Sequence, residues 1–328
     1  MEPPLHPEAD AILAHLKKEG VNELYHFTSI ENLPSICHAQ ELQSKQRQQQ
    51  MGTWPPPRPG GNSLSRDLDR FQNWNKVSLS LTPFTPMAYH RKREDHLCFL
   101  VVRPEVATWQ GVVFTDTNAT KTNHRRGEGP TGLAAIHFDY IRSISIPKDP
   151  AWKYYVQAEV LLPNAVPFGY IEHVAFVSEA SRQYAEHLCQ ALSHPPFVVR
   201  EQLFTDSHRA SPQSIGFPYV NEMFLTDTNI DENMVYSSKK NIFSKSRHTS
   251  MFLVARIRAI TATSVKFTIS APDGSRSEGV LGTTVFDKPD EYICQCKINL
   301  TDLQIGGYLL QCYIQKFCWA AIDVDIQP

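Results

Sequence analysis

Glu159 is the residue of this sequence best suited to chemistry, because it is an acid inside a strand pattern. Apolar and polar residues alternate from Val156 to Leu162, and a second apolar run extends from Ile171 to Val177. The pattern predicts two successive strands. A carboxylate in mid-strand is disfavoured, so one that faces a cleft could use its charge on a substrate. A solvated residue on the polar face of a half-buried strand is the alternative.

A second group of candidate residues lies near the N-terminus. The segment LYHFTSIENLPSICHAQEL, from Leu24 to Leu42, predicts a short strand, a turn and a helix that begins near Ser29. Free N–H groups at the start of a helix could bind phosphate or amide oxygens beside His26 and Thr28. A structural histidine that bonds to nearby backbone explains His26 equally well.

Two arginines, Arg66 and Arg70, precede the alternating strand from Val77 to Leu81. A guanidinium that faces a cleft could bind a diphosphate or ribose hydroxyls. The spacing of four also fits a helical face on which the arginines pair with Asp67 and Asp69.

The chain has 328 residues and a formal net charge of −2, with 41% apolar and 20% charged residues. This length and composition predict a soluble protein of two domains. Because the protein has no overall basic field, a nucleic-acid partner would need a local patch. The runs Arg91–Arg93 and His124–Arg126 are candidates, although each could be a solvated turn.

Seven cysteines are scattered without a CxxC pair or zinc spacing, so we expect neither a metal site nor a disulfide framework. The first ten residues are polar and proline-rich, and no apolar run approaches the roughly 18 residues of a membrane span. We therefore expect a cytoplasmic protein that does not enter a membrane.

Other segments position these candidates. We expect an amphipathic helix within Pro7–Glu19 and a flexible loop over Gln43–Gly61 that could fold over a substrate. Strands are predicted over Leu97–Val102 and Val112–Thr115, and Thr117–Gly132 reads as a loop.

The C-terminal third has a different pattern. Short alternating runs separated by turns follow Met223, with a hairpin turn predicted at Asp273-Gly274. The pattern predicts an immunoglobulin-like sandwich of about seven strands. We expect domains at 1–194 and 223–328, joined by a linker at 195–222, with the second domain acting in sensing or docking.

Four motifs occur in order between Leu24 and Leu192: LYHFTSIENLPSI, DLDRF before KVSLSLTPFTPMAY, VVFTDTNAT, and VQAEVLLPNAVPFGYIEHVAFVS. This order resembles the DarT-type ADP-ribosyltransferases, toxins that transfer ADP-ribose from NAD to nucleic-acid bases. The resemblance implies an α+β fold in which an ADP-ribosyltransferase-like split β-sheet core with helices precedes the all-β sandwich.

The resemblance also implies roles for particular residues. Glu159 would be catalytic, and Arg70, with Arg66 as the alternative, would serve both catalysis and NAD binding. NAD would be the substrate, and no metal would be needed. The remaining NAD-binding residues would be His26, Phe27, Thr28, Ser35 and Leu42.

The substrate stays open at this point. The strand SLSL replaces the aromatic-rich strand of the thymidine-modifying branch, so guanine or an RNA base is as open as thymidine in single-stranded DNA. The resemblance implies a toxin or antiphage effector, with a possible antitoxin or phage-derived trigger as partner. A protein ADP-ribosyltransferase and an inactive nucleotide-binding or protein-binding module are the alternatives.

Overall fold

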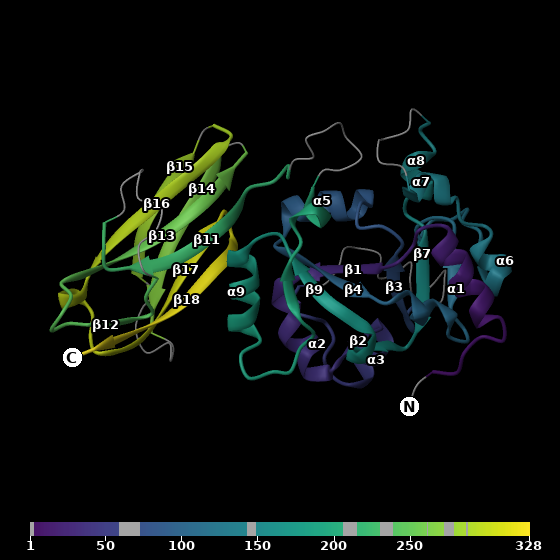
Figure 1. Ribbon diagram of the computed structural model, residues 1–328, viewed down its shortest axis with the longest axis horizontal. Coiled ribbons are helices and arrows are strands. Elements are labelled where there is room, and N and C mark those ends of the chain that lie inside the picture. The colour runs from purple at the N-terminus through teal and green to yellow at the C-terminus, as the bar shows by residue number, and fades with distance from the viewer. Residues whose placement is uncertain are drawn as a thin grey trace. The chain divides into compact units, whose positions relative to one another are not determined.

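The computed structural model describes residues 3–58, 73–142, 149–205, 215–229, 239–260, 262–271, 279–286 and 288–328. Arg66, Arg70 and the predicted turn at Asp273-Gly274 lie outside the described residues. The chain divides into two compact units (Figure 1). Unit 1 comprises Met1–Phe176 and Leu188–Ser214, and unit 2 comprises Val177–His187 and Ile215–Pro328.

Unit 1 is built on an eight-stranded sheet with the order β10-β9-β4-β1-β3-β7-β5-β6. Neighbouring strands are antiparallel except for the parallel pair β10 and β9. The strands are β1 (Leu24–Ser29), β3 (Lys76–Ser80), β4 (Leu97–Val102), β5 (Val113–Thr115), β6 (Arg126–Glu128), β7 (Glu159–Pro163), β9 (Ile171–Phe176) and β10 (Phe197–Val199). A two-stranded sheet pairs β2 (Glu41–Gln43) with β8 (Ala165–Pro167).

The burial of each strand follows from the pattern of its residues. Every residue of β4 is buried, as its continuous apolar sequence LCFLVV predicts for a central strand. In β3 the apolar Val77 and Leu79 are buried while the polar residues between them are partly exposed. Phe99 on β4 and Phe114 on β5 are fully buried and anchor the core.

Short helices surround the sheet. In α1, Ile12 and Leu16 are buried at the i, i+4 spacing of one helical face, and Gly20 follows the helix with φ +77°. The α-helices of unit 1 are α1 (Ala9–Lys18), α2 (Leu33–Ala39), α3 (Lys45–Gln50), α5 (Pro86–Glu94), α6 (Gly129–Leu133), α7 (Phe138–Arg142) and α8 (Trp152–Tyr155). The 3₁₀ turns are η1 (Ile30–Asn32), η2 (Pro104–Thr108), η3 (Phe168–Tyr170) and η4 (Glu201–Phe204).

Three expectations for local structure are corrected. The expected loop over Gln43–Gly61 contains α3, whose first turn is capped by Ser44 Oγ accepting from Arg47 N at 3.2 Å. The segment Thr117–Gly132 contains β6 and most of α6. Val156 ends the helical turn α8 rather than starting a strand, because Trp152 and Val156 are buried together at i, i+4 spacing.

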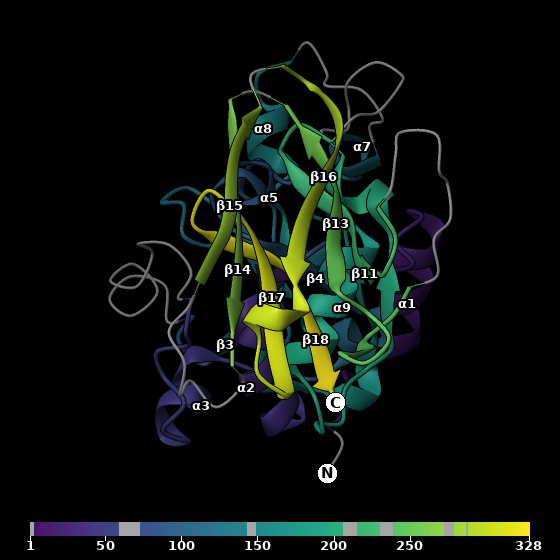
Figure 2. The same cartoon turned by 90° about the vertical axis from the view of Figure 1, so that its left-hand side faces the viewer.

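Unit 2 contains helix α9 (Glu179–Leu188), apart from its last residue, and two β-sheets (Figure 2). In β13, Met251, Leu253, Ala255, Ile257 and Ala259 are all buried at every second position, which gives the strand one core face. One sheet has the order β11-β13-β16 and the other β12-β18-β17-β14-β15. The strands are β11 (Tyr219–Thr226), β12 (Ile242–Ser244), β13 (Ser250–Ala259), β14 (Thr263–Ser270), β15 (Gly279–Phe286), β16 (Asp290–Asn299), β17 (Gly306–Ile314) and β18 (Phe317–Gln327), with the 3₁₀ turn η5 (Leu300–Asp302).

The predicted fold class is therefore confirmed: an α+β core with a split sheet comes first, and an all-β unit follows. No helix among the described residues is long and apolar enough to cross a membrane.

Candidate active site

The sheet of unit 1 is split between β1 and β3. Six register pairs join β1 to β4 and five join β3 to β7, whereas in the described residues one pair, Tyr25 with Ser80, joins β1 to β3. The two half-sheets therefore separate beyond this pair.

Glu159 lies in the row of residues that crosses this junction. Tyr25 pairs with Ser80, Ser80 pairs with Glu159, and Glu159 pairs with Thr115. Residues that pair directly across antiparallel strands project on the same face. The sheet register thus places the carboxylate of Glu159 two strands from the start of β1.

The Glu159 carboxylate is held by the turn that follows β5. One carboxylate oxygen, Oε2, accepts from the backbone N–H of Ala119 at 2.8 Å, and Oε1 lies 3.4 Å from Asn118 Nδ2. The amide oxygen of Asn118 accepts from the backbone N and the Oγ1 of Thr120, which turns its NH₂ group toward Glu159. These donors fix the orientation of the carboxylate.

His26 lies across the split. Its Nδ1 is 3.0 Å from the carbonyl oxygen of Ser78 on β3, and since a carbonyl can only accept, Nδ1 carries the proton and donates. Burial lowers the pKa of His26, and the bond to Ser78 offsets part of this effect. A neutral imidazole with a fixed tautomer therefore connects the two half-sheets.

Asn32 attaches a distant segment beside Thr28. Its Nδ2 donates to Thr28 Oγ1 at 3.0 Å and to the carbonyl oxygen of Arg58 at 2.9 Å, and its Oδ1 accepts from Arg58 N at 2.9 Å. The Arg58 guanidinium also forms two bonds to Glu31, at 2.6 and 3.3 Å. The buried Asn32 thus fixes Arg58 next to the predicted NAD-binding strand.

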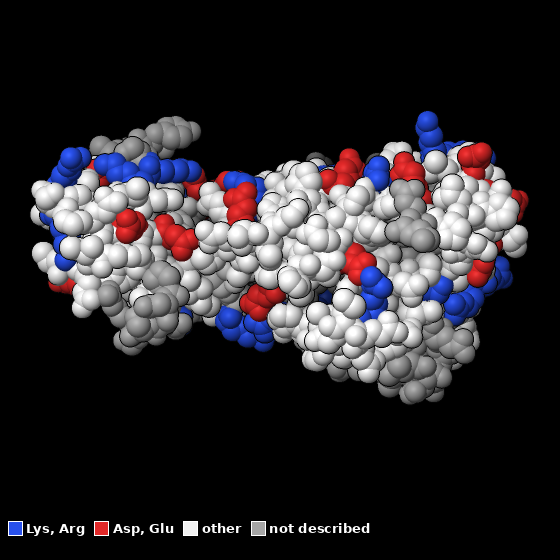
Figure 3. All heavy atoms as spheres, turned by 90° about the horizontal axis from the view of Figure 1, so that it is seen from below, with Lys and Arg blue, Asp and Glu red and all other residues white. Residues whose placement is uncertain are grey.

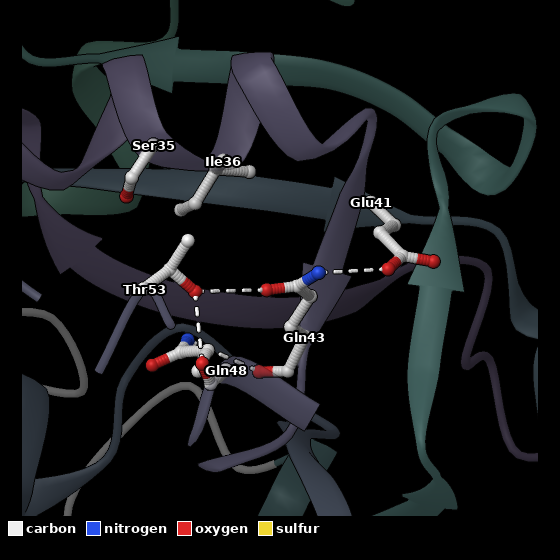
Figure 4. Close-up of a pocket in the computed structure, with 6 residues that line it drawn as sticks. All are labelled: Ser35, Ile36, Glu41, Gln43, Gln48 and Thr53. Carbon is white, nitrogen blue, oxygen red and sulfur yellow. Dashed lines mark hydrogen bonds between the residues drawn. The ribbon is translucent and has the colours of Figure 1, made fainter. Parts of the chain in front are cut away.

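Ser35 lines a shallow opening of about 220 Å³ between α2, β2 and the segment after α3 (Figure 4). Its Oγ donates to the carbonyl oxygen of Asn32 at 2.8 Å. This volume includes space that is open to solvent, and the part that the centre of a water molecule can occupy is only about 10 Å³, so the opening is too small for a whole dinucleotide. The other lining residues are Ile36, Glu41, Gln43, Gln48 and Thr53.

The other predicted NAD-binding residues, Phe27 and Leu42, do not line this opening. Phe27 is half-buried on β1 and makes an edge contact with Phe99 at 6.4 Å between ring centroids. Leu42 is buried between Glu41 and Gln43, and because side chains alternate along a strand it projects away from the opening. Asn32 thus connects Thr28 at the end of β1 with Ser35 on α2, whereas His26 lies in the middle of β1 and bonds to Ser78 on β3.

The basic runs differ in their surroundings. On α5, Arg91 pairs with Asp95 at 3.3 Å, and Arg93 stacks over the Tyr89 ring at 3.8 Å. Arg125 and Arg126 are exposed beside β5 and β6. Figure 3 shows one face of the molecule, on which cationic and anionic side chains are interspersed. None of the described residues forms a group of three or more potential metal ligands.

Sequence reasoning missed the residues that hold Glu159 and Thr28, namely Asn118, Ala119, Asn32 and Arg58. The polar turn DTNAT after the strand at Val113–Thr115 was a usable signal, since Asp, Thr and Asn favour turns with side chain to backbone bonds. Its contact with Glu159 spans 40 residues of sequence and depends on the pairing of β5 with β7.

A family model described as "ssDNA thymidine ADP-ribosyltransferase, DarT" matches residues 25–205, which is more than half of the 328-residue chain. The chain belongs to this family of ADP-ribosyltransferases. The predicted class, an NAD-dependent enzyme that transfers ADP-ribose, is confirmed. No curated protein matches the chain.

Solved structures of DarT proteins are similar to part of the chain. DarT of Thermus sp. 2.9 in complex with NAD⁺ is 20% identical, with 56% of this chain and 97% of that chain covered and a TM-score of 0.46. The same protein with ADP-ribosylated ssDNA covers 62% of this chain and 99% of its own, at 18% identity and a TM-score of 0.46. DarTG of Thermosipho africanus in complex with ADP-ribose is 19% identical, with 57% of this chain and 52% of that chain covered and a TM-score of 0.49.

The geometry of His26 leads to a prediction about pH. An unfolded histidine has a pKa near 6.5, so between this value and the lowered pKa of folded His26 the unfolded state binds more protons. The stability of unit 1 should therefore fall as the pH drops through about 6.5. His173, whose pKa burial also lowers, contributes with the same sign.

Thermal denaturation between about pH 7.5 and 5.5 checks this expectation. His26→Asn keeps a donor near Ser78 and does not titrate, so its melting temperature should decline less steeply than that of the parent. The exposed His38→Gln variant is the control and should keep the parental slope. Equal slopes for the parent and His26→Asn would contradict the assignment of a neutral imidazole that donates to Ser78.

Proposed function

We propose that the chain transfers ADP-ribose from NAD to a thymidine base in single-stranded DNA, and that Glu159 is the catalytic residue. The observation that carries the proposal is the carboxylate of Glu159, held by Ala119 N–H and Asn118 in the strand row that crosses the split sheet. The family description supplies the DNA and the thymidine. Such a carboxylate is fixed before a substrate arrives, which is what electrostatic catalysis requires.

The reaction breaks the bond between nicotinamide and the ribose C1′. Nicotinamide leaves with the bonding electrons, and positive charge develops on C1′ and the ring oxygen. A nitrogen of the base attacks C1′, and its proton is released. In this proposal the Glu159 carboxylate stabilises the positive charge and accepts the proton.

We propose that NAD binds along the split, at the end of β1. His26 and Thr28 would contact it directly, Phe27 and Leu42 would support this side, and Ser35 would bind its outer part beside the shallow opening. Arg70, with Arg66 as the alternative, would provide the guanidinium that holds the diphosphate in register. No metal has a role in this proposal.

The biological role proposed for the chain is that of a toxin or antiphage effector. An antitoxin or a phage-derived trigger would then control it. We assign the catalytic chemistry to residues 1–194 and a sensing or docking role to 223–328, with 195–222 as the linker. Every residue proposed to act in the reaction lies in the first of these parts.

A panel of acceptors tests the proposed substrate. With labelled NAD, we expect label on single-stranded DNA that contains thymidine and little label on the matched duplex, because a paired and stacked base must first be unstacked at a cost of a few kcal/mol. Single-stranded DNA without thymidine should remain unlabelled. Label on guanine or on RNA would show that thymidine in single-stranded DNA is not the substrate. Label on polypeptide would favour protein modification, and the absence of any label would favour an inactive binding module.

A further inference from the structure

Four aromatic side chains form a cluster at the surface of unit 1, which we call the aromatic cluster: His137, Tyr140, Tyr154 and Tyr155. The ring of Tyr155 is central to the cluster. Its centroid lies 4.0 Å from that of His137, 5.4 Å from that of Tyr140 in a stacked arrangement, and 5.1 Å from that of Tyr154 in an edge contact. His137 is exposed and the three tyrosines are partly exposed.

Core packing does not explain the cluster. Helices α7 and α8 lie side by side near the end of β7 (Figure 1). Each helix is already anchored by other residues, since Phe138 and Ile141 are buried in α7 and Trp152 is buried in α8. The tyrosines occupy the outward positions of the same helices. An array of aromatic rings on an outer face is a feature of binding surfaces.

Hydrogen bonds place the cluster next to Glu159. Thr117 Oγ1 donates to the carbonyl oxygen of Tyr154 at 2.5 Å, and the Tyr154 hydroxyl donates to the carbonyl oxygen of Asn123 at 2.5 Å. Thr117 immediately precedes Asn118 and Ala119, the two residues that hold the Glu159 carboxylate. The cluster is therefore built onto the turn that positions the catalytic candidate.

The charge beside the cluster suits a polyanion. Lys121 and Arg125 in the loop before β6 are exposed, as are Arg126, the first residue of β6, and Lys153 on α8. The nearby carboxylates have partners: Asp116 accepts from Arg125 N at 2.9 Å, Asp149 from the Tyr140 hydroxyl, and Asp139 from Arg142. Four exposed cations thus lie beside the aromatic rings in a chain of net charge −2, together with the acids Asp139 and Asp149.

Aromatic rings beside cationic side chains are the combination that binds single-stranded nucleic acids, because bases stack on the rings and cations contact phosphates. We propose that the aromatic cluster binds a base next to the target base of single-stranded DNA, while Lys121, Arg125 and Arg126 contact the adjoining phosphates. This inference rests on the proposed function, and it adds a second subsite to it.

The test compares Tyr155→Leu, which removes the ring but keeps an apolar side chain, with the control Tyr155→Phe, which keeps the ring. In transfer assays we expect Tyr155→Leu to raise KM for single-stranded DNA about 10-fold, the effect of losing one base stack. KM for NAD, kcat at saturating DNA and the hydrolysis of NAD without DNA should not change. Tyr155→Phe should match the parent in every measurement.

A modified substrate distinguishes stacking from a structural role. In an oligonucleotide with abasic positions on both sides of one thymidine, no neighbouring base remains to stack, so Tyr155→Leu and the parent should show the same KM. An undiminished difference between them on this substrate would overturn the proposal. Reduced NAD hydrolysis in Tyr155→Leu would also overturn it, because the residue would then be structural.

Direct binding separates this inference from the proposed function. Fluorescence anisotropy with a labelled single-stranded oligonucleotide and no NAD needs no transfer reaction. If Tyr155→Leu binds about 10-fold more weakly than the parent, the subsite stands even where thymidine proves to be the wrong base. If both proteins bind the oligonucleotide equally, the subsite is wrong even where transfer to thymidine is confirmed.

Discussion

Glu159→Gln is expected to lower ADP-ribose transfer by at least about 100-fold while the protein remains folded. Removing one preorganised electrostatic group at the reacting atoms commonly costs a factor of 10² to 10³ in turnover. The substitution keeps the size of the side chain and removes the negative charge that would meet the developing charge on the ribose. NAD binding should persist, because the proposed contacts of His26 and Thr28 are unchanged.

The cost of this substitution in stability should be small. Glutamine keeps an oxygen that can accept from Ala119 N–H, but its NH₂ group then faces the NH₂ group of Asn118. This unfavourable contact should cost about 1 kcal/mol in the free energy of unfolding. Thermal denaturation and a transfer assay on the same sample provide the measurement.

The control for Glu159→Gln is Glu172→Gln, which removes an exposed acid from β9 of the same sheet and should remain active. Full activity of Glu159→Gln would end the catalytic assignment. An inactive Glu159→Gln that has also lost several degrees in melting temperature would show that the acid is structural.

Gly132→Ala should have the largest effect on stability. A Cβ at Gly132 would lie 2.1 Å from the carbonyl oxygen of Gly127 and 2.3 Å from its carbonyl carbon. Both atoms belong to the backbone of β6, so no side-chain rotation can relieve the clash, and α6 and β6 must separate. Overpacking of this kind typically costs 1–3 kcal/mol.

A loss of about 2 kcal/mol corresponds to a fall of roughly 4–8 °C in the melting temperature of a domain of this size. Transfer should fall as well, because β6 pairs with β5, which leads into the turn that holds Glu159. Gly169→Ala is the matched control, because a Cβ at Gly169 has no described atom within 4 Å and its backbone is not left-handed. An unchanged melting temperature for Gly132→Ala would contradict the close contact of α6 with β6.

Much of the fold could be predicted because it is encoded locally. The continuous apolar run of β4 and the alternation in β3 each indicate a strand without reference to the rest of the chain. The prolines that flank the QRQQQ tract favour a loop, but the helix propensity of Gln and Arg prevails and the tract lies in α3. At Val156 the alternating pattern predicts a strand, but alternation over a few residues also fits the helical turn that the structure has there.

The site could be predicted only in part, for a physical reason. The acid Glu159 and the histidine His26 stand out by residue type, and the motif order connects them to one family. The split between β1 and β3 depends on strand pairing across more than 50 residues, as does the bond from His26 to Ser78. Local pattern carries no information about such pairs.

The central claim is that Glu159 directs ADP-ribose from NAD onto thymidine in single-stranded DNA. The most direct test incubates the parent and Glu159→Gln with NAD and a single-stranded oligonucleotide that contains one thymidine, and then locates the modification by nuclease digestion and mass spectrometry. The account predicts one ADP-ribose on the thymidine nucleoside with the parent and none with Glu159→Gln. ADP-ribose on another base, or equal modification by both proteins, would contradict it.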